Sequence, residues 1–197
     1  MGPPPRTRTR FRRLTEESTT MTSTTTHPAT ADLMDAYPAL VSCRTQFLRY
    51  GGRGSFHGTV ATVRCREDNG LVKDAVAEPG RGRVLVVDGG GSLHTALVGD
   101  NLAQTAADRG WAGIVVVGAV RDVLGLSRID IGVLALGTNP RRPSSAGAGT
   151  LDGPVSSGGA VFLPGHLLFA DGDGVVTGPP DALPPFSPFR TPSEERS

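Results

Sequence analysis

The 197-residue chain is poor in cysteine, aromatic side chains and lysine, and it lacks a long apolar run. Its two cysteines, Cys43 and Cys65, have no CxxC spacing, which excludes a zinc-ribbon type of site and a disulfide framework. No apolar segment approaches the roughly 20 residues that a transmembrane helix needs. The Arg12-Arg13 pair is not followed by the apolar segment of an export signal. We therefore expect a cytoplasmic protein with reduced thiols and no membrane partner.

Charge of one sign is also scarce outside the N-terminal segment. Residues 1–20 carry five arginines and two glutamates, a net charge of +3, and the whole chain carries +1, which leaves −2 for residues 21–197. Lys73 is the only lysine. A groove for nucleic acid needs a basic surface, so this balance argues against direct nucleic-acid binding.

The composition that is present predicts one globular domain between two tails. Residues 1–29 are rich in Arg, Pro, Thr and Ser, and we expect them to be a disordered tail. Residues 181–197 are rich in proline and predict a second tail. Residues 30–180 contain the apolar segments, together with many glycines, and are expected to form a single turn-rich domain.

Apolar periodicity within this domain predicts an α/β fold. Helices are expected at 30–36, at 71–76 and from Asp100 to about 107, and strands at 59–66, 83–88, 113–118, 131–136, 159–163 and 167–170. The last two strands are expected to flank a turn at 171–174. The strands at 83–88 and 113–118 are almost continuously apolar and enclose a helix. This pattern predicts a βαβ unit in a sheet that is covered on both faces.

Three charged residues are expected to meet at one rim of that sheet. Arg121 and Asp122 follow the strand that ends near Gly118, and Asp100 opens the preceding helix. In a βαβ unit the helix begins at the carboxyl edge of the sheet, where ligands usually bind. A carboxylate suits Mg²⁺, and a guanidinium can bind a substrate carboxylate through two hydrogen bonds. The structural alternative is a helix cap at Asp100 and a surface ion pair between Arg121 and Asp122.

Other candidate motifs are weaker. The glycine run at 89–91 follows a strand, as phosphate-binding loops do, but it lacks both GxGxxG and Gly-Lys-Ser/Thr. Glycine there is better explained by positive φ angles or by close backbone approach. The histidines have no HExxH spacing, which argues against a histidine-ligated metal. No Gly-rich motif is followed by an acidic ribose ligand, so a methyltransferase is a poor hypothesis.

Four stretches of the sequence resemble the RraA-like family, which includes the regulator of ribonuclease E activity A and the class II 4-hydroxy-4-methyl-2-oxoglutarate aldolases. The stretches are Phe47-Leu48-Arg49-Tyr50-Gly51-Gly52-Arg53-Gly54-Ser55-Phe56-His57-Gly58, Glu67-Asp68-Asn69-Gly70, Gly82-Arg83-Val84-Leu85-Val86-Val87-Asp88-Gly89-Gly90-Gly91-Ser92 and Gly118-Ala119-Val120-Arg121-Asp122. The likeness extends in order from about residue 30 to residue 176, and it is greatest to actinobacterial members.

The resemblance implies a fold, an assembly and a site. The fold would be a swivelling β/β/α domain, similar to phosphohistidine domains, assembled as a homotrimer or a dimer of trimers with sites between subunits. The aldolase members carry an Asp, twenty intervening residues and then Arg-Asp, and Asp100 and Arg121-Asp122 match this spacing. By this carry-over Asp122 ligates a divalent metal, and Arg121 binds the substrate carboxylate and the enolate. Asp100 orients a water, and the turn Gly99-Asp100-Asn101-Leu102 holds substrate.

The same resemblance implies a lyase that depends on Mg²⁺ or Mn²⁺. Its small 2-oxo acid substrate would be 4-hydroxy-4-methyl-2-oxoglutarate, cleaved to pyruvate, or oxaloacetate, which would be decarboxylated. Aldolase members also use an acid from the C-terminal region of a neighbouring subunit, and this chain offers Glu194 or Glu195 there. The alternative is a non-catalytic regulator that binds and inhibits RNA-degrading machinery of the ribonuclease E type.

Overall fold

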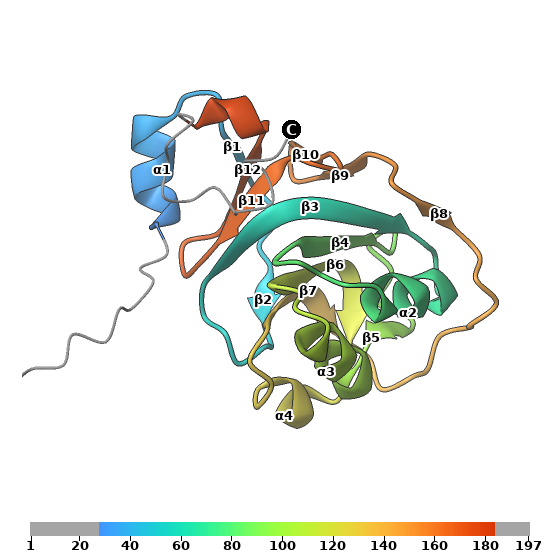
Figure 1. The fold of residues 1–197 in the computed structure, drawn as a ribbon. Coiled ribbons are helices and arrows are strands. Elements are labelled where there is room, and N and C mark those ends of the chain that lie inside the picture. Colours follow the sequence, from blue (N-terminus) through green and yellow to red (C-terminus); the bar gives the residue numbers. More distant parts are fainter. Residues whose placement is uncertain (1–27, 184–197) are drawn as a thin grey trace, which may run out of the picture.

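A ten-stranded sheet forms the centre of the computed structural model, which describes residues 28–183 (Figure 1). The strands are β1 (Val41–Cys43), β2 (Leu48–Arg49), β3 (Phe56–Arg64), β4 (Val84–Asp88), β5 (Ala96–Val98), β6 (Gly113–Val120), β7 (Gly132–Thr138), β8 (Thr150–Leu151), β9 (Val155–Ser157), β10 (Ala160–Phe162), β11 (Leu167–Ala170) and β12 (Val175–Gly178). The helices are α1 (Thr30–Ala36), α2 (Gly70–Ala77), α3 (Asp100–Asp108), α4 (Val123–Leu126) and the 3₁₀ turn η1 (Pro180–Ala182). The sheet has the order β1-β12-β11-β3-β4-β6-β7-β2, with β5 added to β6 and β8 to β3, whereas β9 and β10 form a separate hairpin.

The centre of the sheet is parallel and buried on both faces. Strands β3, β4, β6 and β7 pair in parallel, and every residue of β6 is buried. In β4, Leu85 and Val87 face the core that α2 and α3 cover, whereas Val84 and Val86 face a second core. That second core contains residues of β9, β10 and β11, and Figure 1 shows α2, α3 and α4 on the opposite side of the sheet. The predicted α/β class with two covered faces is therefore confirmed, with helices on one face and strands on the other.

Two details of the predicted element order are wrong. The turn at 171–174 joins β11 to β12, a strand that was not predicted, and does not lie between the two predicted strands. The expected βαβ unit also contains an extra strand, β5, between β4 and α3. Strands β1, β2, β8 and β9 were not predicted either. All of these unpredicted strands are two to four residues long, too short for local periodicity to reveal them.

Close packing at the amino ends of β6 and β7 depends on glycine. The ring of Phe56 lies against Gly113 and Gly132, which are paired in register across the two strands. A Cβ atom at either glycine would collide with the ring. These contacts fix the end of the parallel sheet that lies opposite the carboxyl edge.

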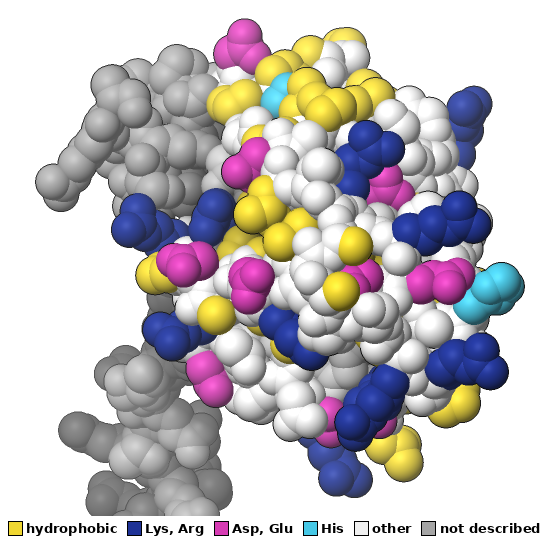
Figure 2. All heavy atoms as spheres, turned by 90° about the vertical axis from the view of Figure 1, so that its right-hand side faces the viewer, with side chains coloured by type: hydrophobic (Ala, Val, Ile, Leu, Met, Phe, Trp, Pro, Cys, Tyr) yellow, Lys and Arg dark blue, Asp and Glu magenta, His cyan; other side chains and the backbone are white. Residues whose placement is uncertain are grey.

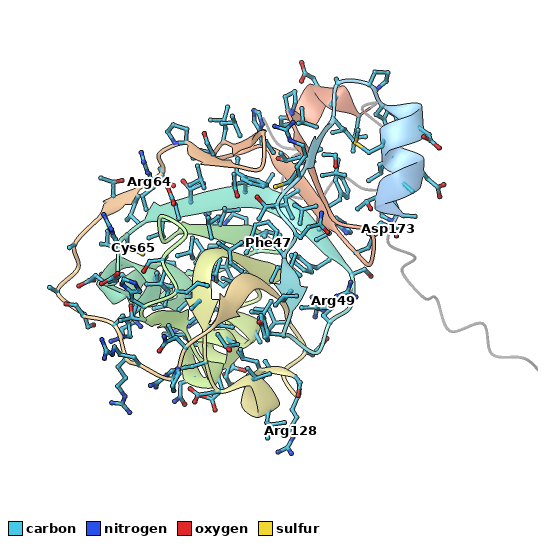
Figure 3. The ribbon with its side chains drawn as sticks, turned by 180° about the vertical axis from the view of Figure 1, so that it is seen from behind. Phe47, Arg49, Arg64, Cys65, Arg128 and Asp173 are labelled. Atoms are coloured by element: carbon cyan, nitrogen blue, oxygen red, sulfur yellow. The ribbon has the colours of Figure 1, made fainter. Side chains whose placement is uncertain are left out.

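The two ends of the described chain meet in a small apolar cluster on the part of the sheet formed by β11 and β12. It contains buried residues of α1, β11, β12 and the segment after η1, including Leu33, Phe169 and Leu183. Asp171 joins these parts, because its carboxylate accepts hydrogen bonds from the Thr30 amide and the Thr30 hydroxyl, both at 2.7 Å. Figure 3 labels Arg49 and Asp173 on this side of the molecule, and Arg49 donates to the carbonyl of Asp171 at 2.9 Å.

The predicted tails fall mainly outside the described residues. Residues 1–27 and 184–197 are not described, so the expected disorder there, and the candidate acids Glu194 and Glu195, lie outside this part of the chain. Residues 181–183 are described, and Leu183 is buried against the core. Within residues 28–183, no helix is both long enough and apolar enough to cross a membrane.

Candidate functional site

The structure places Asp100, Arg121 and Asp122 in the lining of one pocket of about 260 Å³. Arg121 and Asp122 directly follow β6, and Asp100 opens α3 at the same carboxyl edge of the sheet. The rest of the predicted substrate-binding turn, Gly99, Asn101 and Leu102, also lines this pocket. The pocket therefore brings together all six predicted site residues that lie in the described part of the chain.

The first turn of α3 differs in one detail from the prediction. Gly99 is the residue that precedes the helix, and Asp100 is its first helical residue, whereas the structural alternative made Asp100 the cap. The Asp100 Oδ1 atom accepts a hydrogen bond from the Asn101 amide at 2.7 Å. A carboxylate in the first turn is also favoured by the positive end of the helix dipole. Asp100 is therefore held at the pocket by the same helix end that its charge stabilises.

Asp122 occupies an unusual backbone conformation. Its φ and ψ angles are 58° and 42°, in the left-handed region that L residues other than Asn and Asp rarely adopt. Its carbonyl accepts hydrogen bonds from the amides of Gly125 and Leu126, the last two residues of α4. The Arg121 amide donates to the Val98 carbonyl at 3.0 Å, so β5 holds the other side of the turn. The neighbours fix this strained turn, which aims both side chains at the pocket.

Arg121 and Asp122 form an ion pair at the pocket wall. The Arg121 Nε and Asp122 Oδ2 atoms are 3.2 Å apart, and the side chains are 24% and 39% exposed. The structural alternative therefore holds in part, because this pair exists. The pair leaves both groups accessible to a ligand, so a structural role does not exclude a binding role.

Two glycines make room for the two carboxylates. A Cβ atom at Gly99 would lie 2.7 Å from Asp122 Oδ2, and a Cβ atom at Gly125 would lie 2.8 Å from Asp100 Oδ2. Each glycine thus lacks a side chain at the place where the carboxylate from the other turn lies. Gly125 was not predicted, because nothing in the local sequence shows that α4 approaches α3.

The carboxylates of the pocket suit a divalent metal that keeps most of its water ligands. They do not suit a metal that is fully enclosed by protein ligands. Among residues 28–183, no group of three or more His, Cys, Asp and Glu side chains is arranged to hold a metal. Mg²⁺, however, usually takes one or two protein carboxylates and keeps several waters. Asp122 beside Asp100 supplies hard oxygen donors of this kind, and the space over Gly99 accommodates the Asp122 carboxylate. The residues present therefore fit Mg²⁺ or Mn²⁺.

Sequence reasoning did not identify three further polar residues of the pocket. Asn69, Lys73 and Arg142 line it together with the predicted residues. The Lys73 Nζ atom donates to the Ser145 hydroxyl at 2.6 Å, and the Asn69 side-chain amide donates to the Leu97 carbonyl at 3.2 Å. The Asn69 Oδ1 atom is buried and has no partner among the described residues. Two signals were available: Asn69 lies in a stretch that resembles the family, and Lys73 is the single lysine of the chain.

Asp68 fastens the loop that carries Arg142 and Ser145 to the start of α2. Its buried carboxylate accepts hydrogen bonds from the amides of Gly70, Ala146 and Gly147, at 2.9, 2.6 and 3.0 Å. The hydrogen bond from Gly70 is the largest cause that lowers the pKa of Asp68, to about 2; burial acts in the opposite direction. The loop side of the pocket is thus held by an acid that stays ionised.

Other chemistry-bearing residues lie away from this pocket. His94 is exposed and lies 3.2 Å from Glu67, beside Asn139, Pro140 and Arg141. Cys65, which Figure 3 labels next to Arg64, lines a different pocket at the ends of β3 and β4. Burial, with Asp68 and Asp88 nearby, raises the pKa of its thiol to about 12, so it is a poor nucleophile.

Among the described residues, the surface on the side of α2 and β8 carries charges of both signs. Figure 2 shows lysine and arginine side chains interspersed with acidic ones across this face. A groove that follows a nucleic-acid backbone would need a continuous basic stripe.

Comparison with known proteins identifies relatives along most of the chain. A protein of Ectopseudomonas mendocina, named provisionally as a 4-hydroxy-4-methyl-2-oxoglutarate aldolase, is 53% identical over 154 residues, which cover 78% of this chain and 95% of the relative. The solved structure of the RNA-processing inhibitor RraA from Thermus thermophilis is 46% identical with a TM-score of 0.78 and covers 84% of this chain and 99% of its own. A Geobacillus kaustophilus structure named as an S-adenosylmethionine:2-dimethylmenaquinone methyltransferase is 44% identical, with a TM-score of 0.74 and coverage of 77% and 94%.

The family model of aldolases and RraA proteins matches residues 30–177, the segment that contains the sheet except for the last residue of β12, helices α1 to α4 and every residue of the pocket. The chain therefore belongs to the RraA-like family.

Proposed function

We propose that the protein is a metal-dependent lyase that releases pyruvate from a 2-oxo acid by breaking its C3–C4 bond. The observation that carries this proposal is the meeting of two carboxylates and a guanidinium, Asp100, Asp122 and Arg121, in one small pocket. The name of the Ectopseudomonas relative supports a lyase and suggests 4-hydroxy-4-methyl-2-oxoglutarate as a substrate. Oxaloacetate decarboxylation is the second reaction that the same site would perform.

Each residue has a separate task in this proposal. Arg121 binds the C1 carboxylate of the substrate with its planar guanidinium, which presents two parallel donors. Asp122 holds Mg²⁺ or Mn²⁺, and Asp100 holds and orients a water molecule. The amides at the start of α3, Gly99 to Leu102, form the anion-binding end of a helix and hold the substrate. A bound divalent cation would act as a Lewis acid toward the 2-oxo group.

The proposed cleavage of 4-hydroxy-4-methyl-2-oxoglutarate is a retro-aldol reaction. In 4-hydroxy-4-methyl-2-oxoglutarate, a base takes the proton of the C4 hydroxyl, and a new C4 carbonyl forms as the C3–C4 bond breaks. The electron pair of that bond moves toward C2 and gives the enolate of pyruvate. Arg121 stabilises the developing negative charge. Protonation at C3 by the water beside Asp100 then gives pyruvate, so one substrate yields two pyruvate molecules.

Oxaloacetate needs no base for the bond-breaking step. The C3–C4 bond breaks with release of CO₂, and the same enolate is protonated at C3. Neither Asp100 nor Asp122 is available as the base for the aldol reaction, because each already has another task in this proposal. We propose that this base is an acidic side chain from the C-terminal region of a neighbouring subunit; the candidates Glu194 and Glu195 lie outside the described residues. We propose accordingly a swivelling β/β/α fold in a homotrimer or a dimer of trimers.

A pyruvate-release assay tests this function. The full chain is incubated with oxaloacetate and with 4-hydroxy-4-methyl-2-oxoglutarate, with Mg²⁺ and with a chelator. We expect pyruvate release that requires the cation. Release that is equal with and without the cation would contradict the metal-dependent reaction, and no release from either substrate would contradict the lyase.

A second function is favoured by the Thermus relative, which is named as an inhibitor of RNA processing. In this proposal the chain binds a ribonuclease E-type partner and needs no catalysis. Addition of the protein to such a ribonuclease and a fluorogenic RNA would then slow cleavage of the RNA. The Asp122→Asn variant would slow this cleavage as much as the wild-type protein does. Unchanged cleavage at micromolar protein would exclude this role.

A further inference from the structure

We infer that Lys73 and Arg142 form a subsite for a second carboxylate, which makes the pocket selective for 2-oxo dicarboxylates over 2-oxo monocarboxylates. This inference rests on the proposed function only in that Arg121 binds the first carboxylate. It concerns residues on α2 and on the 139–149 loop, which neither the predicted site nor the proposed bond cleavage uses.

The position of Lys73 follows from the packing of α2. Val72 and Val76 are fully buried in the same core as Ala103 and Ala106 of α3, so the two helices lie side by side on one face of the sheet. Lys73 itself is exposed and lines the pocket. The pocket therefore receives cationic groups from two elements, Arg121 at the end of β6 and Lys73 in α2.

The loop that carries Arg142 is fixed against the same helix. The Asn69 amide donates to the Ser144 carbonyl at 2.9 Å, and the Ser144 amide donates to the Glu67 carbonyl at 2.8 Å. These bonds, and those to Asp68 described above, hold the loop at the start of α2. Ser145 then accepts the hydrogen bond of Lys73, which positions the ammonium group.

The charges of the pocket favour a ligand with two negative charges. Three cationic side chains, Lys73, Arg121 and Arg142, stand against two carboxylates, Asp100 and Asp122. Within residues 28–183, no carboxylate lies within ion-pair distance of Lys73, which donates its hydrogen bond to the neutral Ser145 hydroxyl. The pocket therefore has one excess positive charge before a divalent cation binds and three excess positive charges after it binds. A monocarboxylate neutralises one of these charges, whereas a dicarboxylate neutralises two.

Asn69, the residue before α2, carries an unpaired side-chain oxygen. Asn69 lies one helical turn before Lys73, is 9% exposed and lines the same pocket. Its Nδ2 atom donates to Leu97, which fixes the orientation of the amide and leaves Oδ1 without a partner. An unpaired buried acceptor is costly unless a ligand or water donates to it. The distal carboxylate has no hydrogen to donate to this oxygen, so it is Lys73, and not Asn69, that indicates contact between α2 and the distal part of the ligand.

The experiment compares two ligands of five carbons that differ only at the far end. 2-Oxoglutarate carries a distal carboxylate, and 2-oxopentanoate carries a methyl group in its place. Their dissociation constants are measured by calorimetry on the full chain with Mg²⁺, which requires no turnover. We expect 2-oxoglutarate to bind the wild-type protein about tenfold tighter, the usual size of one hydrogen bond to a charged group.

Variants at Lys73 assign this preference. Lys73→Met keeps the length and apolar stem of the side chain and is expected to abolish most of the preference, with the affinity for 2-oxopentanoate changed less than twofold. Lys73→Arg is expected to retain it. Arg109→Met is the control, because this exposed arginine follows the far end of α3 and does not line the pocket.

The outcomes separate this inference from the proposed function. Equal affinity for the two ligands, binding of neither, or a preference that survives Lys73→Met would overturn the subsite, even if pyruvate is released from oxaloacetate. A preference that Lys73→Met removes supports the subsite, even if neither proposed substrate releases pyruvate. In that case the lyase proposal alone is wrong.

Discussion

The carboxylate of Asp122 is the single group on which the proposed reaction depends most. Asp122→Asn keeps a residue type that tolerates the left-handed conformation, so the fold should remain intact. The change removes the charge that would hold the cation, and we expect pyruvate release to fall by about 100-fold or more. Mn²⁺ binding followed by electron paramagnetic resonance, together with the pyruvate assay, checks both effects. Wild-type cation affinity in Asp122→Asn would remove this residue from the metal site.

Gly99 is expected to matter for activity far more than for stability. The methyl group of Gly99→Ala would lie 2.7 Å from Asp122 Oδ2 and would displace that carboxylate. Because Asp122 is partly exposed, its side chain can move without a large loss of stability. We expect at least a tenfold loss of pyruvate release, with a melting temperature within a few degrees of wild type.

Gly172→Ala is the matched control for this glycine. A Cβ atom there meets only the end of the Arg49 side chain, at 3.8 Å, and the residue lies outside the pocket. Its activity should equal that of the wild type. If Gly99→Ala were equally active, the Asp122 carboxylate would not need the place that the structure gives it.

At the scale of elements, Asp68 joins α2 to the 139–149 loop through an ionised carboxylate. Its folded-state pKa of about 2 lies below the value of about 3.9 for an unfolded aspartate. Its contribution to stability is therefore complete above roughly pH 4 and is lost as the pH falls toward 2. Asp68→Asn should lower the stability at pH 7, and the difference from wild type should shrink between pH 4 and pH 2.

Urea unfolding at several pH values measures this difference. Asp74→Asn, a change of an exposed acid in the same helix, is the control and should leave the wild-type pH dependence in place. A difference between Asp68→Asn and wild type that stayed constant from pH 7 to pH 2 would contradict the role of the charge.

The same scale shows which elements the sequence could predict. The buried strands β4 and β6 are continuous apolar runs, and the periodicity of α3 is clear, so both the elements and their shared rim followed from local patterns. Strand β1 could not be predicted in this way, because its three residues gain their structure by pairing with β12. Lys73 escaped the predicted site for a related reason: the approach of α2 to α3 is a tertiary contact.

At the scale of the whole molecule, Asp171 ties the first described helix to the last hairpin. It receives hydrogen bonds from Thr30, a residue 141 positions away, and so satisfies an amide at the start of α1 that has no partner within the helix. Loss of such a capping interaction costs about 1 kcal/mol. We expect Asp171→Ala to destabilise the protein by roughly this amount and to leave the pyruvate assay unchanged.

Asp173→Ala provides the comparison in the same turn. Asp173 uses its backbone amide to contact Asp171, and this bond does not depend on its own side chain. Its stability in thermal unfolding should therefore equal that of the wild type. A loss of stability as large as that of Asp171→Ala would show that the turn, and not the link to α1, is responsible.

The crossed arrangement of Gly99 with Asp122 has a consequence for how this site can change in evolution. A lineage that keeps the acid at position 122 cannot accept a side chain at position 99 without moving that acid. A lineage that has lost the acid, and with it the chemistry proposed for this site, is released from that restriction. The two positions are therefore epistatic. Among related sequences, substitutions of the glycine should be found chiefly where the aspartate has already been replaced.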